Sequence, residues 1–348
     1  MAFVSDRSGE RTLPRHITVR RGREEDESAT FEVMRKAMNA EMSWANHAAT
    51  RHHLRTSPNA SFWLAEESSF FGANKVIGYA RSIVRDRVWS LTEFFVLPGH
   101  HRQGIGGAIL AGCLEDGTAA GADTRLVLAS HHPGADSLYI RKAGCAPRIP
   151  MLLFSGQTAN LRAMEPHIGP IEDAHSALAD PHANILTYRE CLIAEPIVPG
   201  ASLQAELDAL DRQIVGYARP PEHALWMAQM GGMEGASRLF RRATTGEMVG
   251  YAYYGAHSGG PIVTYAAEDQ PRLLSHVAQL SRMLMRNASD VRMLFPTEQL
   301  CAIAGTNEIM LHWLLHCGWQ IVFQYLYMSS RPLGSPDRFI CHNPLYVL

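Results

Sequence analysis

The chain has 348 residues, which predicts about two domains on the usual scale of roughly 100–200 residues each. Apolar residues make up 46% of the sequence, enough for a sizeable core, and the formal charge of −2 argues against nucleic acid or an anionic membrane as the main partner. No apolar run reaches the ~18 residues that cross a bilayer, so we expect no membrane partner.

The N-terminus and the cysteines predict a cytoplasmic protein with a loose tail. Residues 1–14 are polar, include Arg7 and Arg11, and lack the apolar core of a secretory signal. The six cysteines are scattered and never form a Cys-x-x-Cys pair. This usage is typical of reduced, mostly buried thiols.

The first half predicts a mixed α/β domain over residues 15–156. Period-2 and period-3.6 patterns give the order strand, one or two helices, three strands, helix, strand, helix, strand. The expected strands cover residues 16–20, 62–66, 76–84, 89–96, 124–129 and 151–154. The expected helices cover residues 23–42, 104–119 and 134–143.

The second half repeats features of the first. Val76-Ile77-Gly78-Tyr79-Ala80 returns as Met248-Val249-Gly250-Tyr251-Ala252, and Gly144 after an apolar helix returns as Gly318 at nearly the same offset. Such repetition predicts a tandem duplication, with a linker over 157–184 and a second domain over 185–348. Its expected strands cover residues 248–252, 261–266, 291–295 and 320–328, and its expected helices 272–286 and 303–317.

The most informative segment runs from Phe94 to Gly107. An aromatic, apolar strand ends at Pro98, a short polar loop follows, and glycines beginning with Gly104 open a helix. Glycines allow a tight turn with inward N–H groups, and a helix N-terminus adds unpaired donors, so this order predicts a pyrophosphate site. The G-x-G-x-x-G and Gly-Lys-Ser/Thr patterns of nucleotide-binding folds are absent. A glycine-rich turn that only starts a helix is the alternative.

This segment resembles the acetyl-CoA loop of the GCN5-related N-acetyltransferases (GNAT), whose pattern is Arg/Gln-x-x-Gly-x-Gly/Ala after a Val-x-Pro strand end. Gly104 and Gly106 match the glycines, and Val96 and Pro98 match the strand end. One position differs, because His101 stands where the family has Arg or Gln. Either Arg102, one place later, supplies the charge, or His101 donates a neutral hydrogen bond.

The resemblance implies an α/β (α+β) fold of tandem GNAT-like domains, each a mixed, mostly antiparallel sheet flanked by helices, with a splayed central strand pair. It implies acetyl-CoA as cosubstrate, held by the loop and by strand backbone. The residues implied in binding it are Phe94, Phe95, Val96, Arg102, Gln103, Gly104, Ile105, Gly106 and Gly107. The second domain has Glu268 and Asp269 in place of the glycines. Carboxylates there would repel a pyrophosphate, so we expect that domain to be degenerate and to bind no CoA.

The resemblance also implies catalytic roles. Tyr139 resembles the family's general acid for the departing thiolate, but it lies five residues before Gly144, where four is usual. One inserted residue could rotate it away by about 100°, and an ordinary half-buried helix tyrosine is the alternative. Glu93 is the candidate base, on the strand face with Phe95 and opposite Phe94. A strand glutamate paired with an arginine is the alternative for Glu93.

We therefore expect an N-acetyltransferase that transfers acetyl directly to a primary amine of a small-molecule or peptide acceptor, with a homodimer as one possible assembly. A catalytically silent acyl-CoA-binding or regulatory module is the alternative, because His101 and Tyr139 both depart from the family pattern. Histidine pairs such as His52-His53 lack metal-ligand spacing, so we expect no metal. The G-x-S-x-G motif of serine hydrolases is absent from the sequence, which argues against that class of enzyme.

Overall fold

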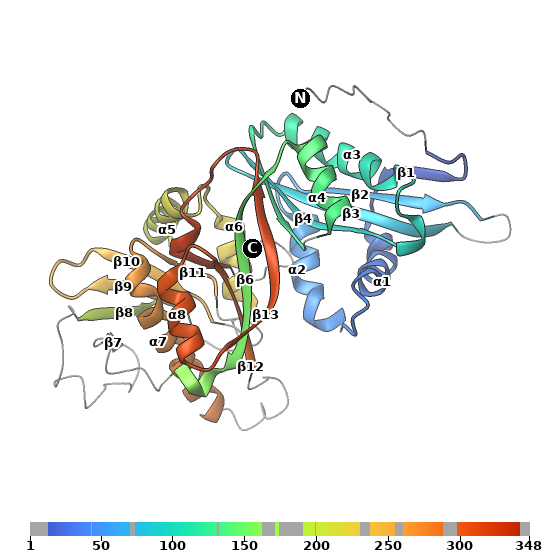
Figure 1. Cartoon of the computed structure of the whole chain (residues 1–348). Coiled ribbons are helices and arrows are strands. Elements are labelled where there is room, and N and C mark those ends of the chain that lie inside the picture. Colours follow the sequence, from blue (N-terminus) through green and yellow to red (C-terminus); the bar gives the residue numbers. More distant parts are fainter. Residues whose placement is uncertain are drawn as a thin grey trace, which may run out of the picture.

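Figure 1 shows the computed structural model of the chain. Most of the predicted tail and linker, and the strand expected over 291–295, lie outside the residues that the structure describes. The described residues are 13–42, 44–69, 74–130, 132–161, 171–173, 191–198, 200–229, 237–254, 260–287 and 298–341.

The N-terminal half follows the predicted order. Its strands are β1 (Ile17–Arg21), β2 (Ser61–Glu67), β3 (Lys75–Arg85), β4 (Val88–Val96), β5 (Thr124–Ala129) and β6 (Ala146–Gln157). Its helices are α1 (Glu27–Met38), α2 (Trp44–Thr56), α3 (Ile105–Ala119) and α4 (Pro133–Leu138). The helix expected over 23–42 is shorter, because Asn39 adopts the left-handed conformation that ends α1.

The C-terminal half has the strands β7 (Ile171–Asp173), β8 (Leu192–Pro196), β9 (Arg238–Arg242), β10 (Met248–Ala252), β11 (Ile262–Thr264), β12 (Glu298–Ala304), β13 (Gln320–Ser329) and β14 (Phe339–Cys341). Its helices are α5 (Ala201–Ile214), α6 (Pro220–Gln229), α7 (Gln270–Asn287) and α8 (Glu308–His316). The helix expected from Ile303 is wrong at its start. Ile303 still belongs to β12, and α8 begins after Asn307, whose side chain accepts a hydrogen bond from the Met310 N–H.

The strands form one mostly antiparallel sheet in the order β1-β2-β3-β4-β5-β13-β6-β12-β14-β11-β10-β9-β8-β7. β13, from the C-terminal half, lies between β5 and β6 of the N-terminal half. β6 in turn pairs with β12 along seven residues from Met151 to Gln157. The two halves are therefore joined by exchanged strands, which the sequence pattern did not predict.

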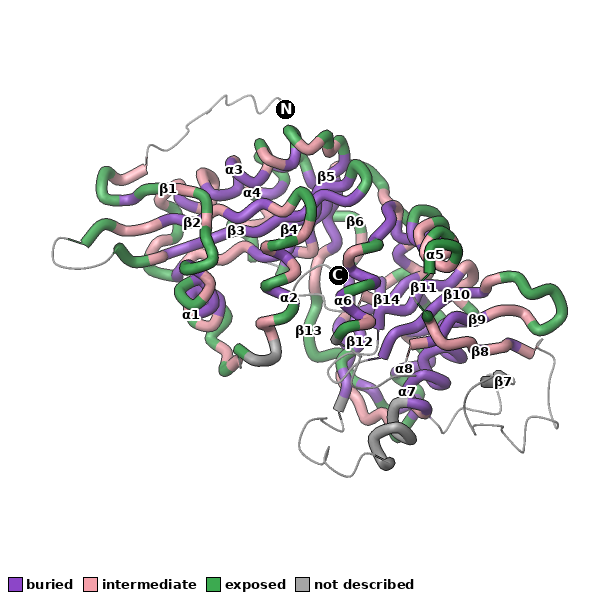
Figure 2. Tube along the Cα trace, turned by 180° about the vertical axis from the view of Figure 1, so that it is seen from behind, coloured by how far each residue is buried: buried purple, intermediate pink, exposed green. Residues whose placement is uncertain are grey.

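Helices cover both faces of this sheet (Figure 1). In the N-terminal lobe, Arg51 of α2 bonds to β4 on one face, and Trp89 of β4 bonds to α3 on the other. In the C-terminal lobe, neighbouring β9 residues point to opposite faces: Leu239 packs with α5 and α6, and Phe240 packs with α7 and α8. Figure 2 shows the resulting buried sheet and helix faces.

The boundary between the lobes is a packed core. One buried cluster contains Ile83 and Leu126 from the N-terminal half together with Leu210, Trp226 and Tyr251 from the C-terminal half. Burial of large apolar side chains from both halves provides the main stabilisation of their junction. The lobes therefore have a fixed relative position.

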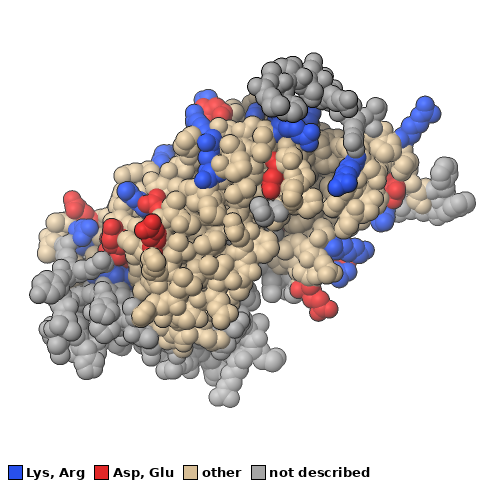
Figure 3. All heavy atoms as spheres, in the orientation of Figure 1, with Lys and Arg blue, Asp and Glu red and all other residues tan. Residues whose placement is uncertain are grey.

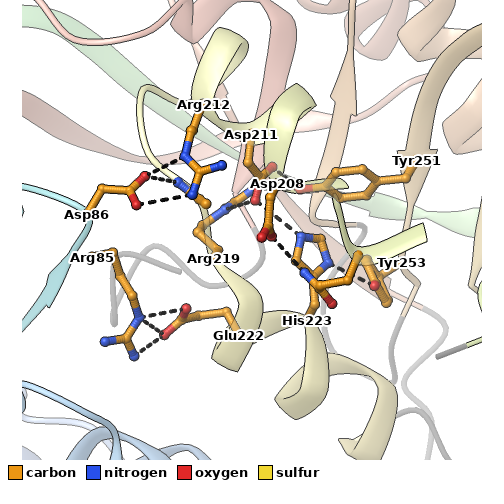
Figure 4. A network of polar contacts seen from close by, with 12 residues as sticks. Arg85, Asp86, Asp208, Asp211, Arg212, Arg219, Glu222, His223, Tyr251 and Tyr253 are labelled. Carbon is orange, nitrogen blue, oxygen red and sulfur yellow. Dashed lines mark hydrogen bonds and ion pairs between the residues drawn. The ribbon is translucent and has the colours of Figure 1, made fainter. Parts of the chain in front are cut away.

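Ion pairs reinforce that junction (Figure 4). Arg85, at the end of β3, lies 2.6 Å from Glu222 of α6, and Asp86 lies 3.0 Å from Arg212 of α5. The Nε2 atom of His53, on α2, also lies 3.0 Å from Glu222. Burial alone would raise the pKa of Glu222, but hydrogen bonds from His53 and Arg85 lower it to about 2. The carboxylate is therefore ionised in the folded protein and ties three elements together.

Candidate functional site

The central strands β4 and β5 separate at the position expected of a splayed pair. They pair in parallel from Val88–Thr124 to Leu91–Val127 and no further. At that point β4 contains a bulge, because Glu93 faces Arg81 and Leu91 faces Ser82, leaving Thr92 as an extra residue. The bulge turns the end of β4 away from β5, so the predicted splay is confirmed.

The splay exposes strand backbone. The Leu97 N–H donates to the Ile77 carbonyl of β3 at 2.9 Å, so Gly78 and Val96 form a non-hydrogen-bonded pair. By alternation, the N–H and C=O groups of Phe94 and Val96 point away from β3, into the gap. No strand among the described residues pairs with this side of residues 92–96. It is an open edge inside the sheet.

Side chains alternate between the two faces of β4 as predicted. The Phe94 ring lies on the α3 and α4 side, where its centroid is 5.9 Å from that of Tyr139. A Cβ atom on Gly106 would lie 3.0 Å from the same ring. Phe95 points to the other face, with its ring centroid 5.8 Å from that of Tyr79. The strand therefore separates an α3/α4 side from an α1/α2 side.

The glycine loop forms a cluster of open donors. Gly104 has φ 85° and precedes the first residue of α3, and Arg102 also has a positive φ, 63°. Within the described chain, the N–H groups of residues 103–107 donate to no protein acceptor. Alternating left-handed residues and a helix N-terminus make an anion-binding concavity. The loop has the geometry that the sequence predicted.

Tyr139 stays at the site because the helix widens. Residues Tyr139–Ala143 form a π turn, and the N–H groups of Gly144 and Cys145 both donate to the Tyr139 carbonyl. The wider turn takes up the extra residue that would otherwise rotate the ring, and such turns often occur at functional sites. The phenol has no hydrogen-bond partner among the described residues. Burial, with Asp136 and Cys145 nearby, raises its pKa well above the usual value.

Glu93 lies in a buried ionic cluster on the α1/α2 side. Its two oxygens lie 2.7 Å from Arg51 and 2.9 Å from Arg81, and Glu27 lies beside the same two guanidinium groups. Arg51 also donates to the Tyr79 hydroxyl at 3.0 Å. These contacts fit the paired-glutamate alternative, and Glu93 as a base stays a prediction. Arg51 and Arg81 were missed because their partner is distant in sequence.

In the C-terminal lobe, the position equivalent to the gap between β4 and β5 is occupied by a strand. β14 lies between β11 and β12, and Ile340 pairs with both Ile262 and Ile303. The turn before α7 carries Glu268 and Asp269, and Asp269 lies 3.4 Å from Arg272. A strand of the chain itself therefore occupies the place where the N-terminal lobe has an open edge.

The surface charge, the possible metal ligands and the helix lengths add three observations. On the face seen in Figure 3, lysine and arginine side chains are spread over the upper part, with acidic side chains among them. Across the described ranges, no group of His, Cys, Asp and Glu is arranged to hold a metal ion. A search of the same residues finds no helix with the length and apolar character of a membrane span.

Comparisons with known proteins agree with this geometry. Residues 27–145 match the family model described as "Acetyltransferase (GNAT) family". No curated protein matches the sequence. A solved Pyrococcus horikoshii protein assigned to the acetyltransferases has a TM-score of 0.62 at 15% identity, over 96% of this chain and 97% of that one.

Two further solved structures span nearly the whole chain. A GCN5-related N-acetyltransferase from Sphaerobacter thermophilus has a TM-score of 0.59 at 14% identity, over 94% of this chain and 100% of that one. A tandem GNAT protein from the clavulanic acid biosynthesis pathway has a TM-score of 0.51 at 15% identity, over 91% and 99%. At these identities the likeness establishes the fold. Residues 27–145 therefore match the acetyltransferase (GNAT) family model, and the chain as a whole has the fold of a tandem GNAT protein.

Proposed function

We propose that the chain is an N-acyltransferase that uses acetyl-CoA and transfers the acetyl group directly to a primary amine of a small-molecule or peptide acceptor. One observation carries the proposal: the open N–H groups of residues 103–107 lie beside a strand edge that pairs with no other strand of the described ranges. The first suits a pyrophosphate, and the second suits an amide-containing arm. Both features come from residues within or adjoining one loop.

Each part of the N-terminal lobe has a distinct task in this proposal. The loop amides and Arg102 hold the phosphates, and the gap-facing backbone of Phe94 and Val96 holds the arm. Acetyl-CoA supplies an activated thioester. The Val96 N–H polarises the thioester carbonyl, as an oxyanion-type donor. A C–N bond to the acceptor forms and the C–S bond breaks.

Two proton transfers complete the reaction. The Tyr139 phenol keeps its proton at neutral pH and gives it to the departing sulfur. The amine loses its proton on the α1/α2 side, where Glu93 or a water molecule accepts it. Because Glu93 already contacts Arg51 and Arg81, we favour a water molecule as the direct acceptor.

The second candidate function is an acyl-CoA-binding or regulatory module without turnover. The buried pairing of Glu93 with Arg51 and Arg81 favours this second candidate, because Glu93 is the one carboxylate that the sequence predicted as the catalytic base. Both candidates share the cofactor site, and only turnover separates them. Thiol release from acetyl-CoA in the presence of a panel of primary amines would establish the transferase, and firm binding without release would establish the module.

Calorimetric titration with acetyl-CoA tests the shared part. We expect one site per chain with micromolar-range affinity, about −8 kcal/mol. Gly104→Glu should abolish binding, because the carboxylate repels a pyrophosphate and a side chain strains the left-handed position. Gly246→Glu is the matched control, since Gly246 also has a positive φ and has no neighbour within 4 Å of its Cβ position. Unchanged affinity in Gly104→Glu, or two sites per chain, would contradict the proposal.

A further inference from the structure

At the open edge of β4, one polar contact among the described residues comes from His101, the residue that departs from the family pattern. The Nε2 atom of His101 lies 2.9 Å from the Val96 carbonyl oxygen. Since that oxygen is an acceptor, the nitrogen carries the proton and donates. The Val96 carbonyl is one of the two that face the gap between β4 and β5. The imidazole therefore completes a bond that an incoming strand or arm would otherwise make.

A second contact holds the ring in that place. The His101 ring centroid lies 5.8 Å from that of His132, in an edge-to-face arrangement. His132 is itself fixed, because its Nδ1 accepts a hydrogen bond from the Ala135 N–H and so caps α4. His101 thus spans the mouth of the gap, from the loop before α3 to the start of α4.

We propose that His101 sets the affinity for acyl-CoA by competing with the amide-bearing arm of CoA for the Val96 carbonyl. This inference rests on the proposed function. For the arm to pair with β4, the bond from His101 to Val96 must break and an amide N–H must replace it. One hydrogen bond is exchanged for another, so the gain from binding the arm is smaller than at an unoccupied edge.

The competition concerns the arm and not the phosphates. The loop amides of residues 103–107 point to the anion site independently of the His101 ring. The nucleotide half of CoA, adenosine 3′-phosphate 5′-diphosphate, carries the pyrophosphate but no arm. A change at His101 should therefore alter the affinity for acetyl-CoA and leave that for the nucleotide half unchanged.

Calorimetry with both ligands on three variants tests this. His101→Ala is expected to bind acetyl-CoA roughly threefold to tenfold more tightly, the range for one hydrogen bond, with no change for the nucleotide half. His101→Gln keeps an uncharged donor of similar reach and should restore the wild-type affinity. His312→Ala, an exposed histidine on α8, is the matched control. His101 is exposed, so each variant should keep the wild-type melting temperature.

The outcomes separate the inference from its premise. Weaker binding of both ligands in His101→Ala would overturn the inference, because His101 would then contact the phosphates. Equal binding in wild type and His101→Ala would overturn it as well. A wild-type chain that binds the nucleotide half but not acetyl-CoA at any concentration, even as His101→Ala, would contradict the role of the β4 edge. Binding of neither ligand by any variant would contradict the proposed function and this inference together.

Discussion

At the scale of single residues, two side chains of the site lie in very different surroundings. Tyr139 touches an aromatic ring and has no polar partner in the described chain, so its proton is not committed elsewhere. Glu93 is surrounded by two guanidinium groups, so its charge is already neutralised. The surroundings of Tyr139 suit a group that donates a proton, and those of Glu93 suit a group that balances the charge of its neighbours.

Tyr139→Phe is expected to lower the rate of thiol release by about 10²-fold or more, because the departing sulfur loses its proton donor. The affinity for acetyl-CoA should stay nearly unchanged, since the ring still packs on Phe94. Steady-state kinetics with the most active amine of the panel gives the rate, and calorimetry gives the affinity. Tyr265→Phe, in the other lobe, serves as the control. Full activity in Tyr139→Phe would make Tyr139 a packing residue.

Glu93→Gln is expected to destabilise the protein by about 3–5 kcal/mol, because it leaves Arg51 and Arg81 with too little negative charge in a buried site. Urea unfolding at pH 7 measures the loss. Glu67→Gln, at the end of β2 and partly exposed, should change stability little. If Glu93→Gln kept its stability and lost the acid limb of its pH–rate profile, Glu93 would be the base after all.

At the scale of elements, the sequence allowed the strand, loop and helix order of the N-terminal lobe to be predicted, because each depends on local patterns. The open loop also follows from its glycines, whereas the splay was implied only by the family resemblance, and the bulge at Thr92 where it begins was not predicted. The π turn at Tyr139 was not predictable, since a helix with one extra residue can either rotate the ring or widen. In the structure the helix widens, and the Tyr139 ring lies against Phe94.

Deleting Ile140 tests this account of the π turn. The residue is exposed, and its removal restores four-residue spacing between Tyr139 and Gly144. We expect the turn to become ordinary α-helix, with Tyr139 still against Phe94 and with acetyl-CoA affinity and thiol release near wild type. Ile140→Ala controls for loss of the side chain alone. A large loss of activity in the deletion variant, with normal folding, would mean that the wider turn itself is required.

At the scale of the whole molecule, the exchanged strands and the interlobe cluster give the two lobes one continuous sheet and a shared core. Neither was predictable, because β13 pairs with β5 and β6 across long sequence separations and Arg85 meets Glu222 only in the folded chain. Unlike the N-terminal lobe, the C-terminal lobe has β14 in the place of an open edge, and its helix α5 contacts the β3–β4 hairpin. Its helices α5 and α6 therefore contact the hairpin whose second strand, β4, carries the open edge.

Glu222 tests how much the contacts between the lobes stabilise the protein, because its contribution to the free energy of unfolding depends on pH in a known direction. Its pKa falls from the ordinary 4.5 to about 2 on folding, so its contribution is complete above pH 4.5 and is lost as pH falls towards 2. The shift corresponds to roughly 3 kcal/mol. Urea unfolding of Glu222→Gln should show a loss of about that size at pH 7, and the difference from wild type should shrink at pH 3.

Comparing Glu222→Gln with wild type and with a control variant at pH 7 and pH 3 separates the effect of charge from that of packing. Glu206→Gln, whose pair with Arg241 is partly exposed, should follow wild type closely at both pH values. Acetyl-CoA affinity at pH 7 should be unchanged in Glu222→Gln, because His53 and Arg85 lie on the lobe junction and the glycine loop lies before α3. Thiol release should fall, since α2 carries both His53 and the Arg51 that pairs with Glu93. An equal stability loss at pH 7 and pH 3 would show that Glu222 acts through packing, and unchanged thiol release would show that the C-terminal lobe does not position α2.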